Sequence, residues 1–245
     1  MTFDRRKIGL ALGVLLLCST APCAWSATAG AATGQYVGQL LAKAHSAYGS
    51  SQAIVVTVGA PDKPRASLVA YAFKNGHWKR ATGKIAAVVG RRGITLDKHE
   101  GDLKSPAGIF YLGRAFGSAP KPDGVDMPYT RTTKNDYWID DTTSPDYNKW
   151  VRYAGNPGTR WKSYERLLVP AYQYMIVIRY NMDPIRKGRG SAIFFHIWPG
   201  PDGSTVGCTA ISKAHLVDLL KWLEPDKRPV IIQGTVAQLK TIAHR

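Results

Sequence analysis

Two short stretches in the C-terminal third of the chain decide how the fold is interpreted: Ser191–Trp198 (SAIFFHIW) and Thr205–Ala210 (TVGCTA). The first is rich in β-branched and aromatic residues, which predicts a buried strand with His196 near its end. The Pro and Gly residues between the two stretches predict a loop that turns the chain back. Cys208 then lies in a short connection before a helix that begins near Lys213. We therefore expect the strand and its return loop to bring His196 and Cys208 together.

These two side chains form a pair with recognisable chemistry. A free thiol is mostly protonated at neutral pH, and a neighbouring imidazole can take its proton or stabilise the thiolate. Gly207 lacks a Cβ, so the backbone N–H groups of Gly207 and Cys208 can approach a substrate and form an oxyanion hole. Each residue alone has a structural interpretation, because a lone His on an apolar strand and a free Cys are most often core residues. Together they favour catalysis, with Cys208 as the nucleophile and His196 as the base.

The N-terminus has the order of a secretory signal peptide. Basic residues 5–7 precede the apolar run Ile8–Leu17, which is too short to span a bilayer, and small residues follow it. Cleavage after Ser26 or after Ala29 fits the small-x-small rule. We therefore expect residues 1–26 to be removed on export to the periplasm or cell wall. A retained membrane anchor is the alternative interpretation.

Cleavage would leave one of the three cysteines, because Cys18 and Cys23 depart with the peptide. In an oxidising compartment cysteines usually occur in disulfide-linked pairs, so the single thiol of Cys208 is notable. The count alone does not distinguish a reactive thiol from a buried structural one. The sequence around Cys208 favours the reactive thiol.

The chain is strongly basic, with a formal net charge of +16 at pH 7. Such a charge favours anionic surroundings such as a wall polymer, a membrane surface or nucleic acid. The basic residues are scattered, and no helix-turn-helix, zinc-finger or RNA-binding signature accompanies them, so we expect no nucleic-acid partner. Contact with a membrane or wall is expected to be peripheral at most, and the sequence does not indicate an oligomeric state.

Hydrophobic periodicity predicts a mainly β domain. Short runs rich in Val, Ile and aromatic residues, separated by Gly, Pro, Asp and Asn, predict strands at 53–58, 67–73, 84–89, 108–112, 174–180, 191–198 and 229–233. In the run 174–180, the even-numbered residues share one face and the odd-numbered residues the other. Helices are expected at 34–47 and after Ser212, which caps the second helix, while Pro225 ends it.

These elements suggest a simple organisation of the chain. We interpret residues 27–52 as an N-terminal helical segment and residues 53–245 as a single catalytic domain. The stretch from Gly113 to Arg166 is polar, with weak periodicity, and we expect it to be one long irregular insertion. Such an insertion in a compact domain is often a lid or a binding loop.

Several blocks occur in the order known from one enzyme family. Residues 89–93 (VGRRG) and 100–108 (EGDLKSPAG) are similar to a Gly-Asp-x-Lys-Thr-Pro-x-Gly signature. The later blocks are WIDD at 138–141, SPDYN at 144–148, GRGSAIFFH at 188–196 and GCTAI at 207–211. From about Val55 to Gln233 the chain thus resembles the L,D-transpeptidase catalytic domains of the YkuD type. It is most similar to the subgroup whose motif ends in Gly-Cys-x-Ala.

The resemblance implies a YkuD-like β-sandwich or barrel with a few peripheral helices, and a specific acyl transfer. Cys208 would attack the carbonyl of the third residue of a peptidoglycan stem tetrapeptide, and His196 would protonate the departing D-alanine. A backbone carbonyl around Ile197 would be the third member of the site. An acceptor amine would then take the acyl group, giving a 3-3 cross-link or attachment to a protein or a D-amino acid.

No cofactor is implied by the resemblance, and no metal site by the sequence. The six histidines lack any His-x-His or His-x-x-x-His pair, and one thiol cannot build a zinc site. The partners that we expect are therefore peptidoglycan stem peptides alone.

The sequence departs from the commoner family pattern where the substrate carboxylate would be held. The arginine often found two residues after the cysteine is Ala210 here. Arg189, Arg92 and Lys104 are candidates to replace it, and we favour Arg189 because it lies beside the His196 strand. Other residues expected to bind the substrate are Ser191, Thr205 and Trp198.

Two other functions remain compatible with the sequence. In an L,D-carboxypeptidase, water rather than an amine would resolve the same thioester. In a non-catalytic wall-binding module, Cys208 would be a buried core residue. Two structural alternatives also stay open: residues 101–108 form a turn that enters a strand, and the aromatic rings of Trp138, Tyr147 and Trp150 either stack on wall sugars or pack in the domain.

Overall fold

The computed structural model describes residues 25–244. The predicted signal peptide lies almost wholly outside these residues, as do Cys18 and Cys23. Helix α1 (Trp25–Tyr48) contains the helix expected at 34–47 and begins earlier than expected. None of the helices in the described part of the chain is long and apolar enough to cross a membrane.

Most strands belong to one sheet that closes on itself as a barrel. In the order β1-β15-β7-β12-β13-β14-β4-β2, each strand pairs with the next, and β2 pairs back with β1. Strand β3 (His77–Arg80) extends the sheet from β2, and β8 (Tyr129–Arg131) pairs with β7. The barrel strands are β1 (Gln52–Val58), β2 (Arg65–Lys74), β4 (Ile85–Val88), β7 (Gly108–Gly117), β12 (Met175–Ile178), β13 (Phe194–Ile197), β14 (Thr209–Ile211) and β15 (Val230–Thr235). The prediction of a mainly β barrel or sandwich with peripheral helices is confirmed.

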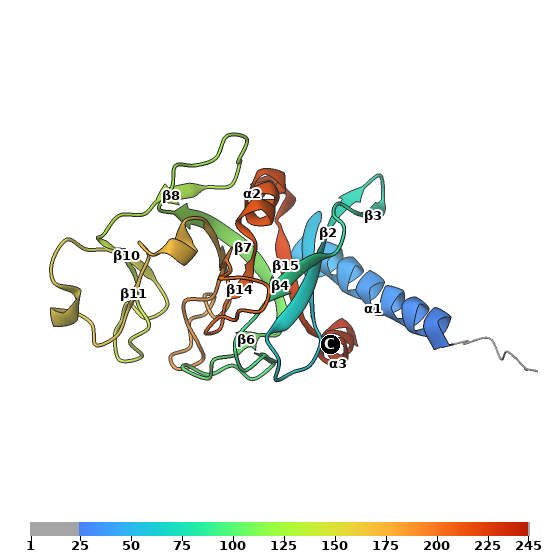
Figure 1. Ribbon diagram of the computed structural model, residues 1–245, viewed down its shortest axis with the longest axis horizontal. Coiled ribbons are helices and arrows are strands. Elements are labelled where there is room, and N and C mark those ends of the chain that lie inside the picture. Colours follow the sequence, from blue (N-terminus) through green and yellow to red (C-terminus); the bar gives the residue numbers. More distant parts are fainter. Residues whose placement is uncertain (1–24, 245) are drawn as a thin grey trace, which may run out of the picture.

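Helices cover part of the outside of the barrel, with α1 at one end of the molecule (Figure 1). Strands β1 and β15 are buried on nearly every residue, because the helices cover the face that would otherwise be exposed. Helix α1 contacts β1, helix α3 (Val236–His244) contacts β15, and the two helices contact each other. The main core accordingly contains side chains from the helices and the barrel, among them Leu40, Ile54, Leu239 and Ile232.

Helix α2 (Lys213–Trp222) agrees closely with the sequence prediction. The hydroxyl of Ser212 caps it by accepting a hydrogen bond from the N–H of His215. Its apolar stripe is buried in the main core, and the single turn η3 (Pro225–Lys227) follows its end. The buried stripe consists of Leu216, Leu219, Leu220 and Leu223.

The prediction of an irregular insertion at 113–166 is wrong in part. Strand β9 (Asp136–Trp138) pairs with both β10 (Trp150–Arg152) and β11 (Glu165–Arg166), which forms a separate three-stranded sheet. Strands of two or three residues are too short to show alternation in the sequence. The remaining short elements are β5 (Ile94–Thr95), β6 (Ser105–Pro106), η1 (Pro157–Thr159) and η2 (Pro170–Tyr172).

The insertion packs on the outer face of the barrel, at the end opposite α1 (Figure 1). The alternation predicted for 174–180 is confirmed, because Ile176 and Ile178 belong to the main core whereas Met175 and Val177 belong to a second core. That second core joins barrel and insertion; the ring of Trp138 lies edge-on to that of Phe194 at 5.1 Å. It also contains Cys208. The interface between barrel and insertion therefore positions the site.

Candidate active site

His196 and Cys208 lie on the same face of the barrel wall. Strands β13 and β14 are parallel, and Phe195 pairs with Thr209. Successive residues of a strand point to opposite faces. Because Phe195 faces the main core, its neighbour His196 points outward. Cys208, next to Thr209, points outward as well and packs in the second core.

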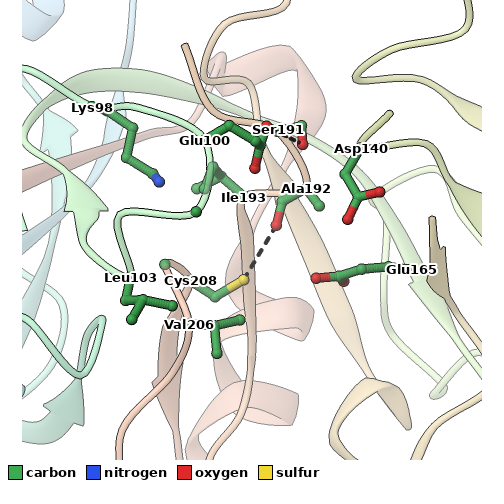
Figure 2. A pocket seen from close by; sticks show the side chains of 12 residues that line it. Lys98, Glu100, Leu103, Asp140, Glu165, Ser191, Ala192, Ile193, Val206 and Cys208 are labelled. Carbon is green, nitrogen blue, oxygen red and sulfur yellow. Dashed lines mark hydrogen bonds between the residues drawn. The ribbon is translucent and has the colours of Figure 1, made fainter. Parts of the chain in front are cut away.

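The strand expected at 191–198 begins only at Phe194, because the backbone before it leaves the extended region. Ala192 has a left-handed conformation, with φ of 53°. This conformation aims its carbonyl at the thiol: the Cys208 Sγ–H donates to Ala192 O at 3.4 Å (Figure 2). The N–H of Phe194 in turn donates to Sγ at 3.3 Å. The thiol is thus held by the backbone that leads to His196.

Asn148, from the insertion, fixes this backbone. Its side-chain oxygen accepts from the N–H of Ala192 at 3.2 Å and from the indole N–H of Trp138 at 2.9 Å. Its amide group donates to the carbonyls of Tyr180 and Asn181 at 3.2 and 2.7 Å. Asn148 is 1% exposed, so all its hydrogen-bonding capacity is used inside the protein. Trp138 and Tyr147 are also buried, which favours packing over sugar stacking for these two rings.

The loop before Cys208 is held from two sides. The carbonyl of Cys208 accepts hydrogen bonds from the hydroxyls of Thr205 and Ser105, both at 2.7 Å. The N–H of Gly207 donates to Thr205 Oγ1 at 3.2 Å, and Gly207 has φ of 150°. A Cβ at Gly207 would lie 3.2 Å from the carbonyl oxygen of Lys104. The loop geometry therefore requires glycine, and the N–H of Gly207 is already engaged.

His196 has the orientation of a neutral base. Its Nδ1 lies 2.8 Å from the carbonyl oxygen of Ile197; because a carbonyl can only accept, the proton of the neutral ring is on Nδ1 and the lone pair on Nε2. His196 is 7% exposed, and burial lowers its pKa to about 4. The ring of Tyr172 lies edge-on to it at 5.2 Å. No hydrogen bond joins His196 to Cys208 in the described structure.

A cavity of about 660 Å³ connects the two residues. His196, Cys208 and Tyr172 are part of its wall, and most of the remaining wall is apolar. Trp198 and Thr205, both expected to bind substrate, also line it. We call it the imidazole cavity. It is large enough to admit part of a peptide on the side of the thiol that faces the base.

A second cavity, of about 170 Å³, reaches Cys208 from its other side. Three carboxyl side chains line it, those of Glu100, Asp140 and Glu165, together with Ser191 and Lys98 (Figure 2). We call it the acidic cavity. Residues 101–108 form a turn that enters β7, which agrees with the structural alternative given for this segment. Gly101 and Leu103 of this turn also line the acidic cavity.

The electrostatic surroundings keep the resting thiol neutral. Burial raises the pKa of the Cys208 thiol far above its ordinary value, and the negative charge of Glu165 adds to this effect. Burial also raises the pKa of Glu165 itself to about 7, opposed by a hydrogen bond from the hydroxyl of Tyr172 at 2.8 Å. The resting site therefore holds a neutral thiol beside a neutral imidazole, which requires proton transfer when the thiol attacks.

Three of the predicted site residues are engaged with other protein groups. Arg189 pairs with Asp97 at 2.5 Å, contacts His99, and does not line either cavity. Ser191 donates to Glu100 at 2.8 Å and lines the acidic cavity. Thr205 holds the Cys208 loop. Arg92 and Lys104, the other candidates for a carboxylate, also do not line either cavity.

Sequence reasoning missed Glu165 and Tyr172. Glu165 belongs to a strand of two residues whose neighbours in the sequence carry no recognisable motif. Its proximity to the thiol arises only from the packing of the insertion on the barrel. Within residues 25–244, no three His, Cys, Asp or Glu side chains are grouped so as to hold a metal ion.

Comparisons with known proteins identify the family of the chain. The family model YkuD, described as the L,D-transpeptidase catalytic domain, matches residues 54–232. No curated protein matches the chain. A solved structure of the helical cell shape determining protein Pgp2 from Campylobacter jejuni is similar with 18% identity and a TM-score of 0.42, covering 79% of this chain and 52% of that one. A variant of the same protein gives 18% identity and a TM-score of 0.40, covering 86% and 60%. The chain thus spans only about half to three fifths of the length of these two structures.

Proposed function

The chain belongs to the YkuD family of L,D-transpeptidase catalytic domains, and we propose that it is a peptidoglycan L,D-transpeptidase in which Cys208 is the nucleophile and His196 the base. The observation that carries this proposal is the placement of the two side chains on one face of β13 and β14, in the wall of one cavity. The predicted signal peptide supports action in the periplasm or cell wall.

Acylation begins with the neutral thiol of Cys208 and the neutral imidazole of His196. The Nδ1–H of His196 donates to the carbonyl of Ile197, which leaves Nε2 free to accept the thiol proton. The Cys208 side chain turns from the carbonyl of Ala192 into the imidazole cavity as its proton moves to Nε2. Sγ then forms a bond to the carbonyl carbon of the third residue of a stem tetrapeptide. The C–N bond breaks, and D-alanine leaves with the proton from Nε2.

The negative oxygen of the tetrahedral intermediate needs backbone donors. The N–H of Gly207 is bonded to Thr205, so we assign the N–H of Cys208 as the main donor. Gly207 contributes by allowing the substrate to approach the backbone closely. Thr205 and Ser105 hold the carbonyl of Cys208, which belongs to the next peptide group, and so restrict the position of Cys208.

The acyl group is released when an amine or water attacks the thioester. His196 Nε2 accepts a proton from the incoming group, and the thiol of Cys208 is restored. An amine on a neighbouring stem gives a 3-3 cross-link, and an amine of a protein or of a D-amino acid gives attachment. Attack by water would make the chain an L,D-carboxypeptidase, which is the second candidate function. The largely apolar imidazole cavity, with Trp198 in its wall, favours an amine by limiting access of water.

A carbapenem tests the nucleophile directly, because its strained amide acylates reactive thiols in such sites. The wild-type protein should gain the mass of one carbapenem on Cys208 in intact-mass spectrometry, and Cys208→Ser should gain none. Incubation with stem tetrapeptide should then give cross-linked dimers. Free tripeptide alone would favour the carboxypeptidase. If no adduct forms and Cys208→Ala leaves binding to isolated wall unchanged, the chain is a wall-binding module and the proposal is wrong.

A further inference from the structure

A third cavity, of about 410 Å³, lies apart from the candidate active site. Its wall is formed by β7, by the segment before β8, by the turn after β12 and by the segment that joins η3 to β15, and it shares no lining residue with the imidazole or acidic cavity. Its volume lies within the range of about 300 to 1,000 Å³ that is typical of small-molecule sites. We call it the arginine cavity, because Arg114, Arg179 and Arg228 line it from three of these segments.

A β-bulge in β7 places Arg114 in the wall of this cavity. From Leu112 to Ala115, β7 advances three residues while its partner β12 advances only two. The extra residue interrupts the alternation of the strand, so Arg114 is exposed whereas Leu112 and Ala115 both belong to the main core. The bulge also contains Gly113, and a Cβ there would lie 3.3 Å from Cγ of Arg179. The irregularity of β7 therefore brings two arginine side chains to the same cavity.

Tyr111 holds the third arginine, Arg228, in position. The guanidinium group of Arg228 lies 5.5 Å from the centre of the Tyr111 ring and donates to the Tyr111 hydroxyl at 2.9 Å. That hydroxyl donates in turn to the carbonyl of Tyr48 at 3.0 Å. The bond to Tyr111 uses one of the five N–H donors of the guanidinium group, which leaves donors for a ligand.

The positive charges of the arginine cavity are not balanced within its wall. Arg179 pairs with Asp183, the one carboxylate among the residues that line the cavity in the described structure. Arg114 donates to the hydroxyl of Thr130 at 2.9 Å, and Arg228 donates to a tyrosine hydroxyl, so neither has a carboxylate partner within residues 25–244. The wall thus has three positive charges and one negative charge, and a bound anion with two negative charges would neutralise it.

A phosphate monoester has the charge and the acceptors that this wall requires. It carries about −1.5 to −2 near neutral pH and offers three acceptor oxygens, and guanidinium groups bind phosphate through paired N–H donors. A carboxylate has a single charge and would neutralise only half of the excess. The other residues of the wall are largely apolar, which suits an organic body attached to the phosphate. They include Leu112, Met127, Pro128, Pro225 and Pro229.

We propose that the arginine cavity binds a phosphate monoester, with its phosphate held by Arg114, Arg179 and Arg228 and its organic body against the apolar wall. This site is separate from Cys208 and His196, so binding there can be measured without turnover and does not depend on the transpeptidase proposal.

Two ligands with the same ring and different charge test the assignment. Phenyl phosphate is a phosphate monoester on an apolar body, and benzoate has a single carboxylate. We would measure their binding by isothermal titration calorimetry to the wild type, to an arginine variant and to a matched control. The arginine variant is Arg114→Gln with Arg228→Gln. The control is Lys79→Gln with Arg80→Gln, which removes the same charge from exposed residues of β3.

We expect the wild type to bind phenyl phosphate about tenfold or more tightly than benzoate. The arginine variant should bind phenyl phosphate about tenfold or more weakly than the wild type, because it lacks two of the three guanidinium groups. The control should bind it as the wild type does. Equal affinities of the wild type for the two ligands, or equal losses in the arginine variant and the control, overturn the assignment.

Asp183→Asn tests the same site in the opposite direction, so the outcome does not depend on whether the arginine variant folds. The change removes the one carboxylate of the wall and its pairing with Arg179. We expect phenyl phosphate to bind about threefold or more tightly to this variant than to the wild type. Unchanged or weaker binding overturns the assignment.

The phosphate can belong to a small molecule or to a lipid headgroup, and co-sedimentation with phosphatidylcholine vesicles, with and without phosphatidic acid, separates the two sources. Binding of phenyl phosphate in solution assigns the site to a small molecule. Binding only to vesicles that contain phosphatidic acid, lost in the arginine variant and kept in the control, assigns it to a lipid headgroup. Absence of binding in both assays overturns the assignment and leaves the proposed acylation of Cys208 unaffected.

Discussion

The side-chain oxygen of Asn148 accepts a hydrogen bond from the backbone N–H of Ala192 at 3.2 Å, and the carbonyl of Ala192 accepts one from the thiol of Cys208 at 3.4 Å. This chain of contacts links the insertion to the nucleophile. Ala192 is in the left-handed region, which costs free energy for a residue with a side chain. Asn148 therefore helps to maintain the conformation that orients the thiol.

Replacing Asn148 by Ala should impair both stability and acylation. The change leaves the N–H groups of Ala192 and Trp138 without their acceptor inside the protein. We expect the free energy of unfolding to fall by about 3 kcal/mol, measured by chemical denaturation. Carbapenem acylation should slow more than tenfold because the thiol loses its fixed position.

The matched control is Asn156→Ala, which changes an exposed asparagine that caps a short turn of the insertion. It should alter stability by less than about 1 kcal/mol and leave acylation unchanged. If Asn148→Ala lowers stability but not the acylation rate of the folded protein, Asn148 has no role in positioning the thiol.

His196 should act as the base from mildly acidic to neutral pH. Burial lowers its pKa to about 4, so the imidazole is neutral and able to accept a proton above that pH. His196→Gln should slow carbapenem acylation about 100-fold or more, with the fold intact by circular dichroism. His77→Gln, an exposed histidine on β3, should leave the rate unchanged.

The pH profile adds a sharper test of His196. In the Glu165→Gln protein, which lacks the carboxyl group whose pKa is about 7, the acid limb of the acylation rate should be centred near pH 4. A limb centred near 6.5, the ordinary pKa of a histidine, would show that the imidazole is not buried during the reaction.

Gly207→Ala should slow acylation while leaving most of the fold intact. Its φ of 150° is unfavourable for other residues, and the new Cβ would lie 3.2 Å from the carbonyl oxygen of Lys104. We expect a loss of about 1 to 2 kcal/mol in stability and a more than tenfold slower acylation, because the loop that orients the N–H of Cys208 must shift. Gly83→Ala, where a Cβ would meet open space, is the control. Equal acylation rates for the two variants would contradict the role of the loop.

Much of the fold could be predicted from the sequence where side chains follow a regular period. The alternation at 174–180 correctly assigned Ile176 and Val177 to opposite faces of β12, because strand side chains alternate. The cap at Ser212 and the leucine stripe located α2 for similar reasons. Such signals are local, so they can be recognised in the sequence without knowledge of the tertiary structure.

Other elements could not be predicted, or were missed although a signal exists. The three-stranded sheet of the insertion has strands of two or three residues, too few for a period. Helix α3 does have a signal: Thr235 and Gln238 form a reciprocal pair in which each side chain bonds the backbone N–H of the other. Closure of the barrel depends on the parallel pairing of β1 with β15, which joins opposite ends of the domain.

In the candidate site, too, some residues could be predicted from local sequence and others could not. His196 and Cys208 are twelve residues apart on one strand and its return loop, so their proximity follows from local sequence. Glu165 reaches the thiol only because the insertion folds back over β13, and no local pattern indicates that. Arg189, favoured because it neighbours the His196 strand in sequence, instead pairs with Asp97. Sequence proximity predicted the reacting pair and failed for the groups that surround it.

The buried carboxyl of Glu165 makes the stability of the protein depend on pH. Its pKa is raised from 4.5 to about 7 by burial, so the folded protein binds this proton more tightly than the unfolded chain does. The stabilisation from this proton is fully present below pH 4.5 and is lost as the pH rises to about 7. His196 has the opposite effect between pH 4 and 6.5, because its pKa is lowered.

Comparing the wild type with Glu165→Gln isolates the carboxyl, because His196 is present in both proteins and its contribution cancels. The free energy of unfolding of Glu165→Gln relative to wild type should increase by about 2 to 3 kcal/mol between pH 4.5 and 8, measured by urea denaturation at several pH values. The same substitution should raise the rate at which iodoacetamide alkylates Cys208 at pH 8, because it removes a negative charge that opposes the thiolate. Tyr172→Phe removes the hydrogen bond that stabilises the ionised carboxyl, so it should extend the loss of stability to higher pH. A stability difference between Glu165→Gln and wild type that stays constant across this pH range would mean that the carboxyl titrates as an ordinary glutamate and does not control the charge beside the thiol.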